Sequence, residues 1–521
     1  MEVKSKGGIN MLAVLKSCSL LGIKGFIIRV EVDLNRGLPA FDIVGLPDTA
    51  VRESRERVKS AIKNSGYDFP VKRITINLAP ANIKKIGPHF DLAIAGGILA
   101  AQNIIKVKEL DDYLIVGELS LNGDVQKVNG ILPMVLTAKK NKFKGVILPE
   151  ENKLEASLVE GIEIIPVSHI SDLIHIFGIN KRKSVFNAQN SNKLFSKKVK
   201  NYEIDFSEIK GQHEAKRAIE IAVAGSHNLI MVGPPGVGKT MLAKRIPTIM
   251  PPLLKEEQLE VSRIQSILGK VNLANGLQTQ RPFRTPHHSI TAASMIGGGK
   301  IPVPGEISLA HKGVLFLDEI SEYRRKVLEL LRQPLEEKKV TISRSTMTVD
   351  FPAEFMLIAS SNPCPCGYYG DPRRECHCTI NQVRRYRNKI SGPLLDRIDL
   401  QLEVPSLDVN ELTEYKKGEK SKNIRKRVIA AQKIQQFRYK NENFINNSHL
   451  SGKNLYKYCK LHKNNKILLK KAIKELGLSA RAYDRILRVA RTISDLEGKE
   501  NIRSGHLAEA IQYRRLEGEI H

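Results

Sequence analysis

Residues 228–243 read Asn228-Leu-Ile-Met-Val-Gly-Pro-Pro-Gly-Val-Gly-Lys-Thr-Met-Leu-Ala243, an apolar run that breaks into glycines and prolines and then resumes with helical spacing. This order predicts a strand, a loop and a helix. The loop fits the pattern G-x-x-x-x-G-K-[ST], in which backbone N–H groups turn inward around phosphates at a helix N-terminus. The expected phosphate-binding residues are Gly233, Pro234, Pro235, Gly236, Val237, Gly238, Lys239 and Thr240.

A second stretch, Gly313-Val-Leu-Phe-Leu-Asp-Glu-Ile320, is an apolar strand that ends in two acids. A buried parallel strand delivers such acids to the nucleotide edge of a sheet. We expect Lys239 to reach the β- and γ-phosphates, and Thr240 and Asp318 to hold Mg²⁺. Glu319 would orient and activate the attacking water. Taken alone, Asp318-Glu319 would more often be a solvated strand end, but the upstream loop favours an ATP site.

The composition describes a globular chain of several domains with an extreme charge. The 521 residues include 41% hydrophobic and 26% charged side chains, and the formal net charge is +28. Length alone suggests two to four domains. The charge predicts a polyanionic partner. A lysine-rich proteome that raises charge everywhere is an equally good explanation on composition alone.

The apolar stretches and the cysteines indicate a cytoplasmic protein. The run from Met11 to Leu15 is too short for a signal peptide, and the run from Leu92 to Ala101 is far below a membrane span. Four of the six cysteines lie between residues 364 and 378, which is no disulfide framework and suits a reducing compartment.

Residues 1–178 form an α/β domain of their own by their alternating pattern. The expected strands are Phe26–Val32, Arg73–Leu78, Tyr113–Gly117 and Gly145–Leu148, and the expected helices are Asp48–Asn64, Asp91–Gln102 and Leu132–Lys140. Residues 179–203 read as a basic flexible linker, because residues 181–200 hold seven Lys or Arg and no acid.

The nucleotide-binding block spans residues 204–405. Asp318 follows Thr240 by 78 positions, which exceeds what one connection needs, so an insertion is expected there. Residues 339–349 alternate like a hairpin. Residues 406–521 turn helical and basic, and Ser479 is a candidate N-cap for the amphipathic stretch that follows it.

These features together resemble the magnesium-chelatase-like AAA+ ATPases of the ComM/YifB type over nearly the whole length. The residues that carry the resemblance are Gly45–Asp48, Arg52–Val58, Gly211-Gln212, the phosphate loop, Arg281–His288, Pro304–His311, Leu331–Leu335, Asn362–Gly367 and Pro393–Ile398. The implied fold is a Lon-protease-like (S5-type) α/β domain, an AAA+ P-loop α/β core and a helical C-terminal lid. Residues 1–10 look like an extension, with Met11 as an alternative start.

The resemblance implies roles for three further residues. Asn362 is similar to the sensor-1 residue, which hydrogen-bonds the attacking water. Arg397 is similar to the arginine finger that a neighbouring subunit inserts at the γ-phosphate. Arg481 is similar to sensor 2 on the lid. A finger in trans requires a ring, and we expect a homo-hexamer.

In related ring motors, the helix-2 insertion and the hairpin around Arg344 project into the pore. Lys300 and Arg344 are therefore candidate DNA contacts, since a basic pore grips phosphates without reading sequence. For any single one of these residues, ordinary surface basicity is the more common explanation.

The cysteine cluster consists of Cys364, Cys366, Cys376 and Cys378. Four thiolates close a tetrahedral zinc site, although C-x-C pairs are less typical of structural zinc than C-x₂-C pairs. The alternatives are reduced thiols in a loop beside the nucleotide site, or a site that uses His377 as a ligand.

The first domain resembles the Lon-protease fold through Gly87–Asp91 and Gly123–Gly130. Lon-type proteolysis needs a serine nucleophile and a lysine base. His89 stands in the place of the serine and Leu132 in that of the lysine, with Lys127 nearby but offset. We therefore expect this domain to be proteolytically inactive and to contact DNA or neighbouring subunits.

The favoured function is a hexameric, ATP-hydrolysing motor that acts on branched or single-stranded DNA, with branch migration or helicase activity in homologous recombination or natural transformation. One alternative is a chelatase-like or protein-remodelling ATPase that does not act on DNA. An ATP-dependent protease is disfavoured by the missing dyad. A nucleotide-switched scaffold is disfavoured by the full set of hydrolytic residues.

Overall fold

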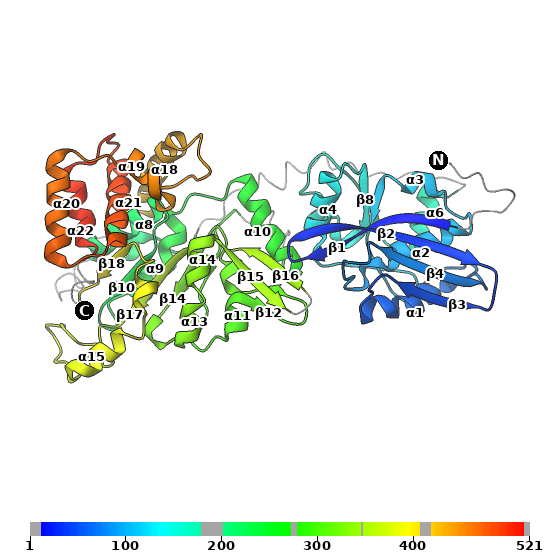
Figure 1. Ribbon diagram of the computed structural model, residues 1–521, viewed down its shortest axis with the longest axis horizontal. Coiled ribbons are helices and arrows are strands. Elements are labelled where there is room, and N and C mark those ends of the chain that lie inside the picture. The colour runs from blue at the N-terminus through cyan, green and yellow to red at the C-terminus, as the bar shows by residue number, and fades with distance from the viewer. Residues whose placement is uncertain (1–11, 179–201, 272–278, 345–346, 407–417, 515–521) are drawn as a thin grey trace. The chain divides into compact units, whose positions relative to one another are not determined.

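The computed structural model describes residues 12–178, 202–271, 279–344, 347–406 and 418–514. The chain forms two compact units (Figure 1). The first unit contains Met1–Lys198 and Gln258–Leu277, and the second contains Val199–Glu257 and Gln278–His521. Both candidate start positions, Met1 and Met11, and most of the expected linker lie outside the described residues.

The first unit is built on a seven-stranded sheet with the order β3-β4-β2-β1-β5-β8-β9. β1 and β2 form an antiparallel hairpin, whereas β1, β5, β8 and β9 run parallel. The strands are β1 (Leu12–Leu21), β2 (Lys24–Asn35), β3 (Ala40–Val44), β4 (Arg73–Ala79), β5 (Tyr113–Ile115), β8 (Gly145–Pro149) and β9 (Glu163–Val167), with the short β6 (Glu118–Leu119) and β7 (Val125–Gln126) beside them. All four strands predicted in this domain are confirmed.

The predicted helices of the first unit are also confirmed. Asp48 accepts a hydrogen bond from the Val51 N–H and so caps α1, while every residue of α2 is buried, as its unbroken apolar sequence requires. The helices are α1 (Thr49–Asn64), α2 (Asp91–Ala101), α3 (Val107–Leu110), α4 (Ile131–Lys140), α5 (Lys153–Ala156) and α6 (Ile170–Phe177).

A segment from far along the chain completes this unit. Helix α10 (Lys255–Ile267) buries Val261 and Ile264. The Ser266 carbonyl accepts the Gly130 N–H at 2.9 Å, and the Ser266 hydroxyl accepts the Leu132 N–H at 3.3 Å. These bonds satisfy donors at the start of α4 that no residue of the helix itself can satisfy.

The second unit is built on a five-stranded parallel sheet with the order β11-β14-β17-β10-β18. Its strands are β10 (Leu229–Val232), β11 (Phe283–Arg284), β14 (Val314–Leu317), β17 (Met356–Ser361) and β18 (Leu400–Glu403). Because all five strands are parallel, their carboxyl ends meet at one edge. That edge receives the phosphate loop after β10 and the two acids after β14.

Helices and two hairpins surround this sheet. The helices are α8 (His213–Gly225), α9 (Lys239–Ile249), α11 (Ala292–Ile296), α12 (Glu306–Leu309), α13 (Arg325–Glu329), α14 (Arg332–Glu337), α15 (Ile380–Arg387) and α16 (Gly392–Leu395). The hairpins are β12–β13 (Gly297–Gly298 and Val303–Pro304) and β15–β16 (Lys339–Arg344 and Met347–Pro352). The second hairpin confirms the prediction that was based on the alternating pattern of residues 339–349.

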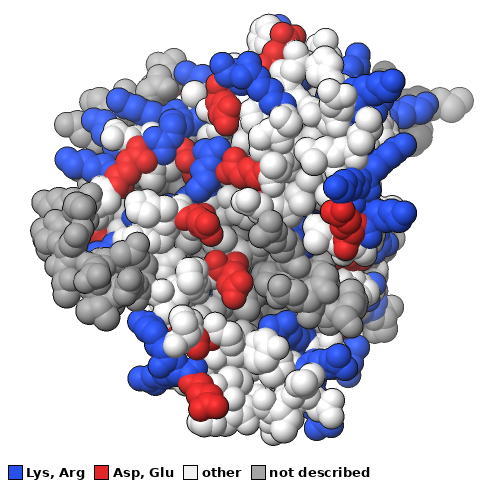
Figure 2. All heavy atoms as spheres, turned by 90° about the vertical axis from the view of Figure 1, so that its left-hand side faces the viewer, with Lys and Arg blue, Asp and Glu red and all other residues white. Residues whose placement is uncertain are grey.

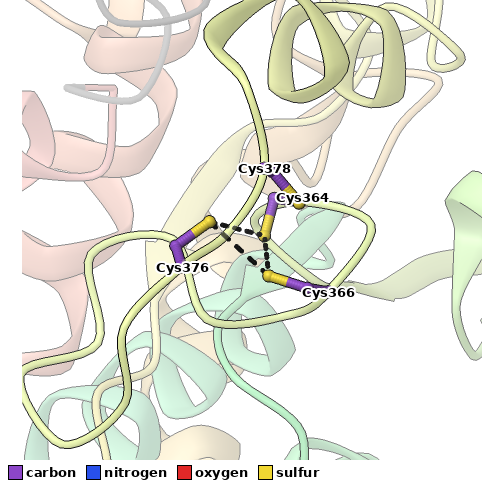
Figure 3. Close-up of side chains that lie close together, drawn as sticks. All are labelled: Cys364, Cys366, Cys376 and Cys378. Atoms are coloured by element: carbon purple, nitrogen blue, oxygen red, sulfur yellow. Dashed lines mark hydrogen bonds between the residues drawn. The ribbon is translucent and has the colours of Figure 1, made fainter.

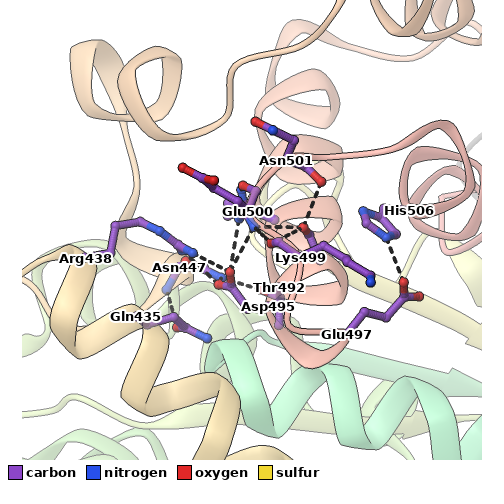
Figure 4. Close-up of polar contacts among 12 residues, drawn as sticks. Gln435, Arg438, Asn447, Thr492, Asp495, Glu497, Lys499, Glu500, Asn501 and His506 are labelled. Atoms are coloured by element: carbon purple, nitrogen blue, oxygen red, sulfur yellow. Dashed lines mark hydrogen bonds and ion pairs between the residues drawn. The ribbon is translucent and has the colours of Figure 1, made fainter.

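The helical C-terminal region shares one hydrophobic core with the parallel sheet. Its helices are α18 (Ser421–Arg438), α19 (Gly452–Tyr458), α20 (Lys463–Leu476), α21 (Ala480–Leu496) and α22 (Ser504–Gln512). Ser479 caps α21 as predicted. Inside the region, the buried Asp495 carboxylate accepts hydrogen bonds from Arg438, Asn447 and Arg491 (Figure 4). These charge-assisted bonds compensate the burial of the carboxylate.

None of the helices formed by the described residues combines the length and the apolar character that crossing a bilayer requires.

Candidate active site

The phosphate loop has the backbone that binds phosphate. Gly236 and Gly238 adopt φ values of +81° and +91°, in the left-handed region that favours glycine. A Cβ placed on Gly236 would meet no atom within 4 Å, so this part of the loop faces open space. Helix α9 begins at Lys239, immediately after the loop, and directs its N-terminus toward the same space.

Lys239 is buried at the base of the loop. Its Nζ donates to the carbonyls of Gly233 and Pro234 at 2.5 and 2.8 Å and to the Asn362 Oδ1 at 3.2 Å. Burial lowers the pKa of Lys239 from 10.5 to about 8. The ammonium is therefore held in place, but its charge lacks an anionic partner of the strength that a triphosphate supplies.

This pKa predicts a pH dependence of nucleotide binding. The folded pKa lies below the unfolded value, so the charged form is disfavoured in the empty site and stability rises as the pH increases from about 8 to 10.5. Bound phosphates restore the charge. We expect nucleotide affinity to weaken above about pH 8, and binding at about pH 8.5 to take up about three quarters of a proton.

Calorimetry of nucleotide binding in two buffers with different ionisation enthalpies measures this proton. The Lys239→Met variant is the control, because it cannot take up the proton. Binding by the native chain without proton uptake at about pH 8.5 would show that Lys239 stays charged in the empty site.

The two acids lie where the sequence predicted them, as the two residues that directly follow the end of β14. The Thr240 hydroxyl donates to the Asp318 carboxylate at 2.8 Å, so the two expected Mg²⁺ ligands are adjacent. Glu319 is exposed, and its φ of 52° places a residue other than glycine in the left-handed region. Such backbone strain gathers at functional sites.

Ser360 orients both acids and was missed by the sequence reasoning. Its hydroxyl donates to the Asp318 carboxylate and accepts the Glu319 N–H, the latter at 2.9 Å. A serine at the end of an apolar strand is common, so its sequence carries no signal. Only the pairing of β17 with β14 places this hydroxyl beside the two acids.

The cysteines converge close to the loop (Figure 3). The Cys364 sulfur lies 3.3 Å from that of Cys366 and 3.7 Å from that of Cys376, and the Cys366 and Cys376 sulfurs are 3.5 Å apart. With Cys378, all four sulfurs lie within 4.8 Å of one another. The Tyr368 backbone N–H lowers the pKa of Cys366 to about 6.

Arg397 and Arg481 lie at the opposite edge of the sheet. Arg397 precedes β18, whose first residue, Leu400, pairs with the first residue of β10, whereas the phosphate loop follows the last residue of β10. Strands of four residues separate the two edges by about 13 Å. Arg481 joins Arg397 there, since its guanidinium donates to the Asp396 carboxylate at 2.8 Å. The structure therefore brings both arginines together, but not to their own phosphate loop.

A cavity of about 620 Å³ opens between these arginines. Seven Lys or Arg and five Asp or Glu line it. Among them, Lys338 has its pKa lowered to about 8 by burial. The cavity therefore offers more positive than negative side chains to a ligand that enters at this edge.

The first unit places His89 and Leu132 in its interior. The His89 ring is buried, its Nε2 lies 2.9 Å from the Cys18 carbonyl, and burial lowers its pKa to about 4. Leu132 packs in a hydrophobic core, while Lys127 is exposed. Neither interior side chain supplies the serine or the lysine of a catalytic dyad.

The fold and the site define an AAA+ ATPase, a class that hydrolyses ATP with Mg²⁺. Family models agree over most of the chain. The magnesium chelatase, subunit ChlI, model matches residues 205–412, its C-terminal model matches residues 418–514, and the model of subunit ChlI of Mg-chelatase matches residues 30–152.

Relatives that match over nearly the whole chain show which family within the AAA+ ATPases it belongs to. The chain is 42% identical over 515 residues to competence protein ComM of Haemophilus influenzae, covering 97% of this chain and 98% of the relative. It is 42% identical over 508 residues to the protein YifB of Salmonella typhimurium, with 97% of each chain covered. An archaeal Lon protease of Methanocaldococcus jannaschii is 28% identical over 185 residues, 34% of this chain and 28% of the protease. The chain belongs to the magnesium-chelatase-like family of the ComM/YifB type.

Proposed function

We propose that the protein is a ring-forming, ATP-driven motor that acts on DNA. The observation that supports assembly into a ring is the position of Arg397 and Arg481, which share the sheet edge opposite the phosphate loop. An arginine there serves the γ-phosphate of a neighbouring subunit rather than its own. The net positive cavity between the two arginines fits the approach of that neighbour's triphosphate. A closed homo-hexamer is the proposed form.

Two adjacent hairpins support the proposal that the partner is DNA. Lys300, in the turn of β12–β13, and Arg344, at the end of β15, are both exposed. A Cβ placed on Gly298 would lie 3.5 Å from the Arg344 Nη2, so the tips of the hairpins meet. Two cations on neighbouring tips suit contact with phosphates. The net charge of +28 and the name of the relative ComM, a competence protein, point the same way. We propose branch migration or helicase activity in recombination or transformation.

The decisive experiment measures ATP hydrolysis with no nucleic acid, with a single strand, with a duplex and with a four-way junction, and uses Glu319→Gln as the control. Stimulation by branched or single-stranded DNA that the variant loses would support the motor. Hydrolysis that none of the DNAs changes would contradict it, and would favour a chelatase-like or protein-remodelling ATPase.

We further propose that the four cysteines hold zinc. A zinc ion bonded to four sulfurs at about 2.3 Å places the sulfurs about 3.8 Å apart. The sulfurs of Cys364, Cys366 and Cys376 lie 3.3–3.7 Å from one another, which is close to that spacing. The first unit, with His89 and Leu132 in place of the dyad, is proposed to be proteolytically inactive.

The zinc proposal predicts about one zinc per chain in the purified protein. Cys376→Ser is expected to lose most of that metal and to lower the melting temperature, because the loop loses its closure. Elemental analysis by mass spectrometry measures the metal. Cys459→Ala, which removes a buried cysteine outside the cluster, should keep it. Equal zinc in the two variants would refute the site.

A further inference from the structure

We infer that the segment that carries the cysteines also forms a groove for the sugar–phosphate backbone of DNA. This inference rests on the proposed DNA motor and names a contact separate from the hairpin tips. The groove, here called the basic groove, has a volume of about 710 Å³. Its lining consists of Ser321, Glu322, Tyr323, Arg325, Asn381, Arg385, Asn388 and Lys389.

The sequence of this segment is unusual within the chain. Residues 368–389 contain five arginines, one lysine and two acids, whereas the whole chain has 51 lysines and 32 arginines. A general abundance of lysine therefore does not account for the segment. Arginine is the cation that fits phosphate with two parallel hydrogen bonds.

The local structure turns the arginines outward. Thr379 and Gln382 cap the start of α15 through reciprocal bonds of 3.3 and 2.9 Å. Val383 and Tyr386 are the buried side chains of this helix, so Arg384 and Arg385 are exposed between them. Among the described residues, neither of these two arginines has an acidic partner within 4 Å. Their charge is available to a ligand.

Aromatic rings hold further arginines of the segment in place. The Arg374 guanidinium lies 5.1 Å from the Tyr368 ring centroid and donates to the Tyr368 hydroxyl at 2.8 Å. Arg387 lies 5.3 Å from the Tyr369 ring centroid. Cation–π contacts of this kind restrict the side chains and reduce the entropy lost on binding.

The charge is visible on the surface. α15 lies at the lower left of Figure 1, and Figure 2, which faces that side, shows lysine and arginine side chains over the whole face, its lower part included. The groove adds asparagine amides to this charge and contains a single acid, Glu322. Cations and amide donors without a hydrophobic centre match a phosphate backbone rather than a folded protein.

The basic groove connects to the ATP site. Ser321 in its lining follows Glu319 by two residues. Arg387 of α15 donates to the Pro363 carbonyl, next to Asn362, at 3.3 Å. A Cβ placed on Gly367 would lie 2.8 Å from the Pro235 Cδ, so the cysteine segment packs on the phosphate loop. A strand in the groove is thereby placed to stimulate hydrolysis.

The test reverses two charges in the full-length protein, with Arg384→Glu and Arg385→Glu together. The control is Lys466→Glu with Lys470→Glu on α20, two exposed lysines whose reversal changes the net charge equally. Binding of a fluorescent single strand and of a four-way junction is measured across a salt series, together with the ratio of DNA-stimulated to DNA-free ATPase rates.

Loss of two phosphate contacts, one made by Arg385 in the lining and one by the exposed Arg384 beside it on α15, is expected to weaken DNA binding about 10- to 30-fold near physiological salt. The slope of log K against log salt is expected to fall by about 1.4 to 1.8. The control variant should bind like the native chain. Native-like binding by the arginine variant, or an equal loss in both variants, would overturn the basic groove while leaving the DNA motor intact. Failure of the native chain to bind either DNA would overturn both. Lost assembly with native-like DNA affinity would reassign the segment to subunit contact.

Discussion

Replacing Arg397 with alanine is expected to lower the ATPase rate of the assembled protein by about 10³- to 10⁵-fold while nucleotide still binds. The reason is electrostatic, since a guanidinium supplied by the neighbour stabilises charge that develops only in the transition state. In the structure this side chain pairs with Glu336 at the far edge of its own subunit. It therefore contributes little to the nucleotide bound by its own phosphate loop.

A mixing experiment separates action in trans from action in cis. Arg397→Ala subunits have an intact phosphate loop, and Lys239→Ala subunits have an intact Arg397. Each variant alone should be inactive, but mixed rings place an intact arginine beside an intact loop and should recover part of the rate. Lys338→Ala provides a comparison, since it removes a cation from the same cavity without removing the finger. No recovery on mixing would refute action in trans.

Glu319→Gln is expected to slow hydrolysis by about 10²- to 10⁴-fold and to leave ATP affinity nearly unchanged. Glutamine keeps the size of the side chain and its left-handed backbone, but it cannot accept the proton of the attacking water. Asp318 and Thr240 remain in place to bind Mg²⁺. Single-turnover hydrolysis measures the rate, and equilibrium binding of labelled ATP measures the affinity.

Glu337→Gln provides the control for this variant, because it makes the same chemical change on an exposed carboxylate at the end of α14, away from the phosphate loop. It should hydrolyse ATP at the native rate. A Glu319→Gln enzyme that retains more than about a tenth of the native rate would show that another group activates the water.

The parts of the fold that depend on local chemistry could be predicted from the sequence. Each of these parts acts through its immediate neighbours in the chain, so a short stretch of sequence is enough to recognise it. Examples are the glycines at 236 and 238, the apolar run before Asp318 and the serine before α21. β1 was not predicted, because Lys16 interrupts its apolar pattern. The structure places the Lys16 ammonium on the Asp111 carbonyl at 2.7 Å, which allows the strand to continue to Leu21.

The missed parts of the site depend on pairing between distant segments. Ser360 reaches Asp318 only because β17 and β14 are neighbours, and Arg481 meets Asp396 only after the C-terminal helices have packed. Residue patterns along the chain do not specify which strands pair. The role proposed for Arg397 follows from resemblance, but its position on the far edge required the register of β18 with β10.

The segment that carries Ser266 has a consequence for synthesis on the ribosome. The first unit is not complete when its last sequence-contiguous helix, α6, has been made, because α4 still lacks its capping partner. At about 5–20 residues per second, roughly 5 to 20 seconds pass before residues 258–267 are added. During that interval the apolar surface that will meet Val261 and Ile264 is open to other chains. Maturation of the N-terminal unit thus waits for residues 258–267, which follow the phosphate loop in the chain, and a fragment cut within residues 179–201 would remain in the unfinished state.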